Sequence, residues 1–119
     1  MNPSTNSLAS RWNTFPRGQQ ILMLGNELNR ALNAIGVDEV AVKNSLERTI
    51  DLVDLTLDSA SRFSERLELA RLRELLAGEY LQSKKIKKER IIALLKMIFQ
   101  FSKESISQVK TLDKRFKLS

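Results

Sequence analysis

Apolar residues are densest between residues 91 and 101, where only Lys96 and Gln100 interrupt the run and neither Gly nor Pro breaks it. On a helical projection these apolar positions fall on nearly every side. The pattern predicts a helix with little solvent-facing surface, around which other helices pack. A membrane-spanning helix needs about 20 consecutive apolar residues, and the charged residues on both sides leave too short a run. We therefore expect a buried core helix and no membrane span.

Upstream, apolar residues recur at spacings of three and four, which indicates amphipathic helices. The first stripe predicts a helix from about Arg17 to Ile35, with Pro16 at its start and Thr14 as a candidate cap. Gly36 suits the end of this helix because glycine tolerates a left-handed backbone.

Asp38 is the expected N-cap of a second helix, which should run from about Glu39 to Leu57 or Asp58. Val37 and Val42 occupy the positions of a hydrophobic staple around that cap. Because the connection is so short, the first two helices should form an antiparallel hairpin.

An acidic stripe on the second helix repeats at spacings of four, three and four: Glu47, Asp51, Asp54 and Asp58. Carboxylates at these spacings share one helix face and could bind a divalent cation. Di-metal sites in helical bundles normally add a Glu-x-x-His motif, and the chain has no His. We therefore interpret the stripe as a solvated face or as a docking stripe for arginines of the third helix. Those arginines are Arg62, Arg66 and Arg73.

The third helix should extend to about Gln82, with Ser59, Ser61 or Ser64 as its cap. Its apolar side comprises Leu67, Leu69, Leu72, Leu75, Leu76 and Tyr80. The lysines that follow indicate the end of this helix and a turn, because cations suit a helix C-terminus. No Gly or Pro enforces the turn, so a single long helix from about Ser64 onward stays an alternative.

The fourth helix carries the apolar run, and a narrower apolar stripe continues beyond it on Ile106, Val109, Leu112 and Phe116. A continuous helix from Glu89 to Phe116 would be about 42 Å long, against about 28 Å for the first helix. Residues 110–119 could therefore overhang the bundle. An overhanging apolar stripe needs cover from a second copy, a partner helix or the N-terminal segment.

Two aromatic residues, Trp12 and Phe15, precede the first helix. Because aromatic side chains gain much free energy on burial, we expect them to fold back over one end of the core rather than to anchor a partner. The polar residues 1–10 should be flexible. The whole pattern predicts one domain over 1–119, an all-α antiparallel bundle of four main helices with a short N-terminal aromatic segment.

Composition narrows the classes of function. The chain has no Cys, which excludes disulfides and thiolate chemistry, and no His, which removes the usual acid/base group at neutral pH. It also lacks a Gly-x-Ser-x-Gly elbow and a glycine-rich nucleotide loop. We therefore expect no enzyme activity and no cofactor. The N-terminus does not resemble a signal peptide, so cytoplasmic residence is the default expectation.

The formal charge of +6 is unevenly distributed. Residues 1–60 hold five Lys/Arg and seven Asp/Glu, whereas residues 61–119 hold fifteen and seven. The densest basic cluster is Lys84, Lys85, Lys87, Lys88 and Arg90. Phosphates of a nucleic acid could bind this cluster in a salt-dependent way, although no zinc module, helix-turn-helix element or interleaved exposed aromatic accompanies it.

Two functional hypotheses follow. The leading one is a non-enzymatic interaction or assembly module that forms a homo-oligomer or binds another helical protein. Its predicted contact residues are Ile106, Val109, Leu112 and Phe116. The alternative is a nucleic-acid-binding protein that uses the basic cluster together with the basic C-terminal helix.

Overall fold

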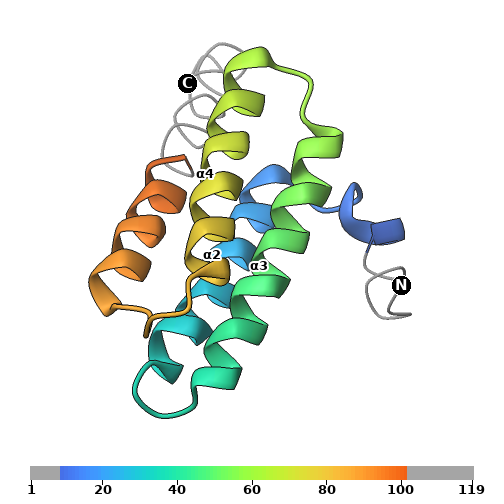
Figure 1. Cartoon of the computed structure of the whole chain (residues 1–119). Coiled ribbons are helices and arrows are strands. Elements are labelled where there is room, and N and C mark those ends of the chain that lie inside the picture. The colour runs from blue at the N-terminus through green and yellow to red at the C-terminus, as the bar shows by residue number, and fades with distance from the viewer. Residues whose placement is uncertain (1–8, 102–119) are drawn as a thin grey trace, which may run out of the picture.

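Four main helices and a short N-terminal helix make up the computed structural model, which describes residues 9–101 (Figure 1). The bounds are Arg17–Ala34 for α2, Glu39–Ser59 for α3, Phe63–Leu81 for α4, 88–101 for the last helix and 9–12 for the short one. Successive main helices run in opposite directions, and the described residues contain no strand. The predicted all-α bundle is confirmed. Within residues 9–101, no helix is long and apolar enough to cross a membrane.

The turn between α2 and α3 follows the sequence prediction. Gly36 has a φ of 81°, in the left-handed region that glycine enters without a Cβ penalty. Asp38 caps α3 by accepting a hydrogen bond from the backbone N–H of Ala41 at 3.1 Å. The Glu39 side chain accepts a second bond, from the N–H of Gly36 at 2.9 Å. These contacts fix the hairpin that positions α2 beside α3.

Two predictions for the helix starts are wrong. The hydrophobic staple does not form, because Val42 is buried while Val37 is 83% exposed. Thr14 does not cap α2, because its hydroxyl donates to the carbonyl of Arg11 at 2.6 Å and Pro16 occupies the N-cap. Pro16 has no side-chain acceptor, so α2 begins without a side-chain cap.

None of the three candidate serines caps α4. Its N-cap is Arg62, which makes no side-chain capping bond. The hydroxyl of Ser59 is used inside α3, where it donates to the carbonyl of Thr56 at 3.0 Å. The first turn of α4 is instead tied to α2, because Arg17 forms an ion pair with Glu65 at 2.7 Å.

α4 ends at Leu81 although neither Gly nor Pro follows directly. Lys43 of α3 explains this end, because its ammonium group donates to the backbone carbonyls of Tyr80 and Gln82. Carbonyls in the last turn of a helix lack intrahelical partners, and a cation there is favourable. Gln82 is extended, and a loop leads on to residue 88. The alternative of one long helix from Ser64 onward is therefore wrong.

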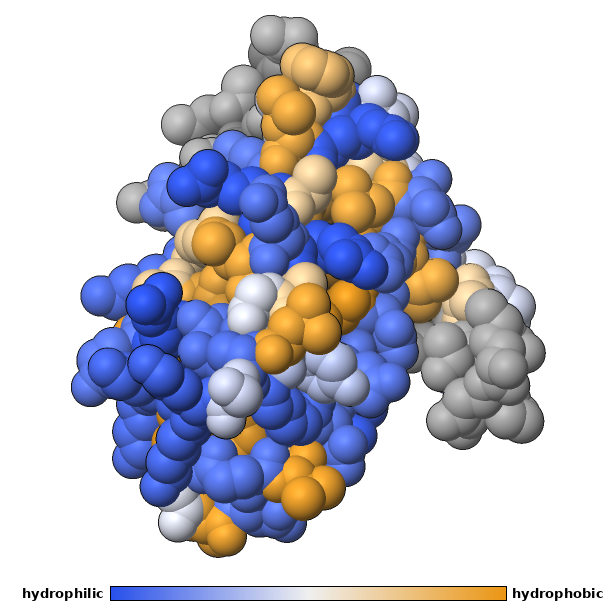
Figure 2. Space-filling view, viewed as in Figure 1, coloured by the Kyte–Doolittle hydropathy of each residue, from blue (hydrophilic) through white to orange (hydrophobic). Residues whose placement is uncertain are grey.

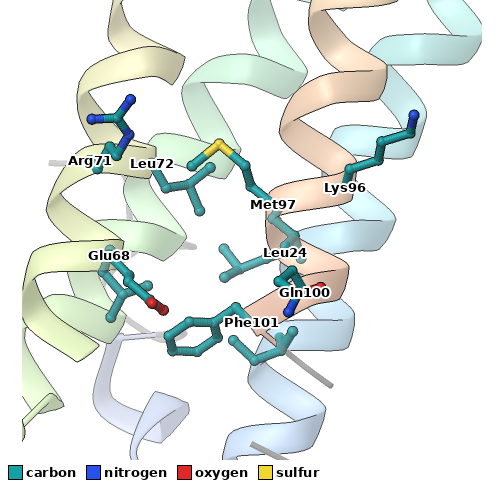
Figure 3. Close-up of a pocket in the computed structure, with 11 residues that line it drawn as sticks. Leu24, Glu68, Arg71, Leu72, Lys96, Met97, Gln100 and Phe101 are labelled. Atoms are coloured by element: carbon teal, nitrogen blue, oxygen red, sulfur yellow. The ribbon is translucent and has the colours of Figure 1, made fainter. Parts of the chain in front are cut away.

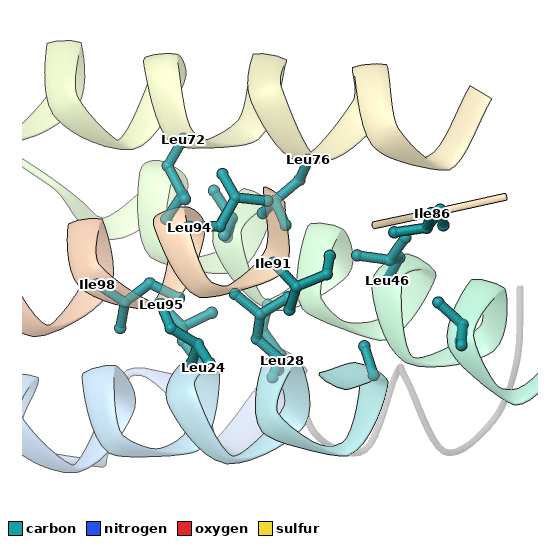
Figure 4. Close-up of a cluster of buried hydrophobic side chains, with 14 of the residues drawn as sticks. Leu24, Leu28, Leu46, Leu72, Leu76, Ile86, Ile91, Leu94, Leu95 and Ile98 are labelled. Carbon is teal, nitrogen blue, oxygen red and sulfur yellow. The ribbon is translucent and has the colours of Figure 1, made fainter. Parts of the chain in front are cut away.

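The core is filled by side chains from all four main helices (Figure 4). Its members include Leu24 and Leu28 of α2, Leu46 of α3, Leu72 and Leu76 of α4, and Ile91, Leu94, Leu95 and Ile98 of the last helix. The last helix is not surrounded, however, since Ile92 is 40% and Phe99 is 59% exposed. The prediction of a central helix is wrong because this helix packs on the bundle from one side only.

Trp12 closes one end of the core, as the sequence predicts. Its side chain is 1% exposed, and its indole N–H donates to Oγ1 of the buried Thr56 at 3.2 Å. Its backbone carbonyl accepts a hydrogen bond from Nε2 of the buried Gln20 at 2.8 Å. The ring of Phe15 stands edge-on to the indole at 6.1 Å between centroids. Trp12 therefore provides hydrogen-bond partners for the buried side chains of Thr56 and Gln20, and its ring completes the core.

We predict that Trp12→Ala lowers the free energy of unfolding by about 3–5 kcal/mol, because it empties a buried site and removes the partner of Thr56. Urea unfolding followed by far-UV circular dichroism measures the change. Thr14→Ala, two residues away and exposed, is the control and should stay within about 0.5 kcal/mol of the parent. A loss below about 1 kcal/mol for Trp12→Ala would show that the segment is not part of the core.

Candidate interaction surfaces

The predicted partner-helix stripe, Ile106, Val109, Leu112 and Phe116, lies outside the described residues. The helix that precedes it is described, and it bears two exposed apolar residues, Ile92 and Phe99. They are seven residues apart, so they share one face two turns apart. In the sequence the same seven-residue step leads from Phe99 to Ile106. In the sequence, the exposed apolar positions of this helix are thus continued by the first residue of the predicted stripe.

α2 carries another exposed apolar residue one turn from the point where it contacts Phe99. A Cβ on Gly25 would lie 3.7 Å from the ring of Phe99, so the ring lies against α2 at this glycine. Leu22, three residues earlier on α2, is 60% exposed. We call the surface formed by Leu22, Ile92 and Phe99 the Phe99 patch.

The basic cluster lies in the loop before the last helix and in that helix's first turn. Lys84, Lys85, Lys87, Lys88 and Arg90 are all exposed. Ile86, in the middle of the cluster, is only 2% exposed and belongs to the core. This buried anchor holds the loop against the bundle while the flanking lysines extend into solvent.

One end of the cluster is fixed by a buried carboxylate. Glu79 is 9% exposed and accepts a hydrogen bond from Nε2 of Gln82 at 2.6 Å. Nε of Arg90 lies 3.8 Å from the other oxygen of Glu79. Arg90 therefore joins the last helix to α4 through its side chain.

A cavity of about 480 Å³ lies between α2, α4 and the last helix (Figure 3). Its lining comprises Ile21, Leu24, Glu68, Leu69, Arg71, Leu72, Lys96, Met97, Ile98, Gln100 and Phe101. Most of the apolar lining is fully buried, so the accessible wall consists of half-buried Met97 and Phe101 with the charged rim. The sequence analysis did not find this site, because its residues come from three helices that are far apart in the chain.

α4 carries exposed apolar side chains that the sequence analysis assigned to its buried side or did not assign. Leu67 is 55% and Leu75 is 40% exposed, and Phe63 at the helix start is 76% exposed. Figure 2 shows apolar surface along the α4 side of the molecule, broken by charged side chains. On a helical projection this stripe lies on a different side from the buried one, Leu69, Leu72 and Leu76, but the apolar residues are spread too evenly around α4 to indicate which side faces the core.

The acidic stripe of α3 has a structural partner on α4. Arg73 forms an ion pair with Asp54 at 2.9 Å, as the docking hypothesis predicts for one of its three arginines. That hydrogen bond raises the pKa of the Arg73 guanidinium above its ordinary value. Within residues 9–101, no cluster of three Asp or Glu side chains could hold a metal ion.

The pKa of Asp51 is raised above its ordinary value of 3.8. Partial burial of the carboxyl is the largest cause, followed by the negative charges of Glu47 and Asp54, while Arg73 acts in the opposite direction. An ionised Asp51 therefore costs the folded state some stability. This loss of stability is complete at pH values above the folded-state pKa of Asp51. It disappears as the pH falls below the ordinary pKa of 3.8.

Asp51→Asn should accordingly raise the free energy of unfolding at pH 7, by up to about 0.5 kcal/mol for an exposed position. The gain should vanish near pH 3, where the parent carboxyl is protonated in both states. Denaturant unfolding at the two pH values measures it. Asp58→Asn removes the same charge from the end of the stripe and should gain less. If Asp51→Asn still raises the free energy of unfolding at pH 3, the charge of Asp51 is not the cause of the gain.

Comparison of the chain with protein-family profiles, curated proteins and solved structures gave no match.

Proposed function

We propose that the protein is a non-enzymatic helical interaction module that self-associates through the Phe99 patch. The observation that carries the proposal is the exposure of two large apolar side chains, Leu22 and Phe99, where α2 meets the last helix. Exposed apolar residues that cluster on one surface favour association, because their burial removes apolar area from water.

The spacing of the patch favours a second copy of the chain as the partner. Ile92 and Phe99 are separated by one heptad, and the sequence continues the step to Ile106. A seven-residue step returns to the same face of a helix, and it is the step between equivalent positions of the seam along which helices pair in coiled coils. A two-fold dimer uses the same patch on both copies, so one chain supplies both halves of the interface. The predicted contacts of Ile106, Val109, Leu112 and Phe116 would extend this seam.

The test compares two phenylalanines of similar exposure. Phe99→Glu should weaken self-association at least about tenfold, because it places an unpaired carboxylate in an apolar interface. Phe63→Glu, on α4 and 76% exposed, should leave association unchanged. Sedimentation velocity over a range of concentrations gives the dissociation constants, and circular dichroism confirms that both variants fold. A parent that is monomeric at all concentrations contradicts the proposal, and so does dissociation by Phe63→Glu alone.

A second candidate function is supported by the basic cluster. The burial of Ile86 fixes the loop, and four exposed lysines around it give a dense positive surface. Such a surface binds nucleic-acid phosphates without reading base sequence. Nucleic-acid binding of this kind would occur at the opposite end of the last helix from Phe99 and is compatible with self-association.

For this second function, the double variant Lys84→Glu/Lys87→Glu should abolish binding of a short labelled duplex. Arg11→Glu, an exposed cation outside the cluster, should reduce it only slightly. Binding by the parent should weaken steeply with salt, with a slope of log affinity against log salt near about −3 to −4 if four phosphates are contacted. Fluorescence anisotropy measures both effects. Equal losses in the two variants would show that net charge, and not the cluster, governs binding.

A further inference from the structure

We propose that the solvent face of α4 binds an acidic amphipathic helix of another protein, along an apolar seam that is bordered by arginines. We call this set of six α4 positions the α4 seam: Phe63, Leu67, Ala70, Glu74, Ala77 and Leu81. None of them belongs to the Phe99 patch. The inference therefore does not depend on the proposed self-association.

The spacing of the α4 seam is that of a helix-pairing surface. Its successive members are separated by four, three, four, three and four residues, which is the a/d repeat along which helices interlock in coiled coils. On a helical projection the seam lies about 150° around α4 from the buried stripe, which is formed by Leu69, Leu72 and Leu76. α4 therefore has apolar residues on two nearly opposite faces, and the core covers one of them.

The large side chains of the seam are exposed. Phe63, Leu67 and Leu81 are 76%, 55% and 78% exposed, and Ala70 is exposed as well. Figure 2 shows the apolar surface on this side of the molecule. From Phe63 to Leu81 the seam extends about 27 Å along the helix, which matches a partner helix of about three heptads. Packing of such a helix would remove the exposed apolar area from water.

The charges beside the seam favour an acidic partner. Arg66 and Arg73 occupy g positions of the repeat, and Arg71 occupies an e position on the other side. Arg73 pairs with Asp54 of α3, but both side chains remain 45% exposed. Residues at e and g form salt bridges with the partner helix and determine which partner fits. Three arginines at these positions are therefore complementary to carboxylates at the e and g positions of the partner.

Glu74 lies in the middle of the seam, at an a position that is normally apolar, and it is exposed. A partner with an apolar residue opposite Glu74 would remove the carboxylate from water without pairing it, which is unfavourable. A lysine at that point would pair with it, so Glu74 favours one register of the partner. The same carboxylate disfavours insertion of this face into an anionic lipid surface.

A designed peptide tests the seam in the full-length chain. The acidic peptide has three heptads, with leucine at a and d, glutamate at e and g, and one lysine at the central a position. Its twin has lysine at e and g instead. Like charges at both flanks keep each peptide from pairing with itself. Fluorescence anisotropy of the labelled peptides should show saturable binding of the acidic peptide, and the twin should bind at least about tenfold more weakly.

Variants of the chain locate the binding site. Leu67→Glu should weaken binding of the acidic peptide at least about tenfold, because it places a carboxylate in the apolar part of the interface. Phe99→Glu makes the same charge change outside the seam and should have no effect. Glu74→Leu should strengthen binding of an acidic peptide whose central lysine is replaced by leucine, and it should not strengthen binding of the original peptide. Circular dichroism confirms that each variant folds.

Several results would overturn the inference. If neither peptide binds, the exposed face of α4 is not a helix-binding seam. Equal binding of the two peptides would contradict the role of the arginines. Equal weakening by Leu67→Glu and Phe99→Glu would show that net charge, and not the seam, governs binding. Loss of self-association in Leu67→Glu would assign the face to a second copy of the chain, and binding to anionic phospholipid vesicles without binding of the acidic peptide would assign it to a membrane.

Discussion

The last helix can bury only one of its faces, and the rest of the molecular surface depends on this constraint. Ile91, Leu94 and Ile98 are inserted against α2 and α4 and join a core that contains residues from all four helices. Its start is held by the buried Ile86 and by the contact of Arg90 with Glu79. Because that face packs in the core, the other apolar residues of the helix lie at the edges of the packed face or in solvent.

The two edges of this helix have different chemistry. On the side of α2, Phe99 lies against Gly25 and stays exposed, which produces an apolar patch suited to another helix. On the side of α4, Met97 and Phe101 border a cavity that residues of α2 and α4 also line. One helix therefore contributes both to the proposed interaction surface and to the wall of the cavity.

Much of the fold could be predicted from the sequence because its signals are local. The stripe of α2, the glycine at its end and the Asp38 cap determine the first hairpin within a few residues of chain. The end of α4 could not be predicted in this way, because Lys43 provides it from a different helix. The packing of the apolar run over residues 91–101 could not be predicted for the same reason, because its composition does not indicate which helices it contacts. The cavity joins side chains from three helices, and no spacing along the chain indicates it.

Native-state hydrogen exchange tests most directly whether the last helix is an integral part of the core. If it is, the amides of Ile91 to Ile98 should exchange through the same global opening as those of the buried segment around Val53 in α3, with equal free energies and equal dependence on denaturant. Exchange of the last helix through a separate opening of much lower free energy would contradict the account. Both the Phe99 patch and the cavity would then belong to a helix that leaves the bundle independently.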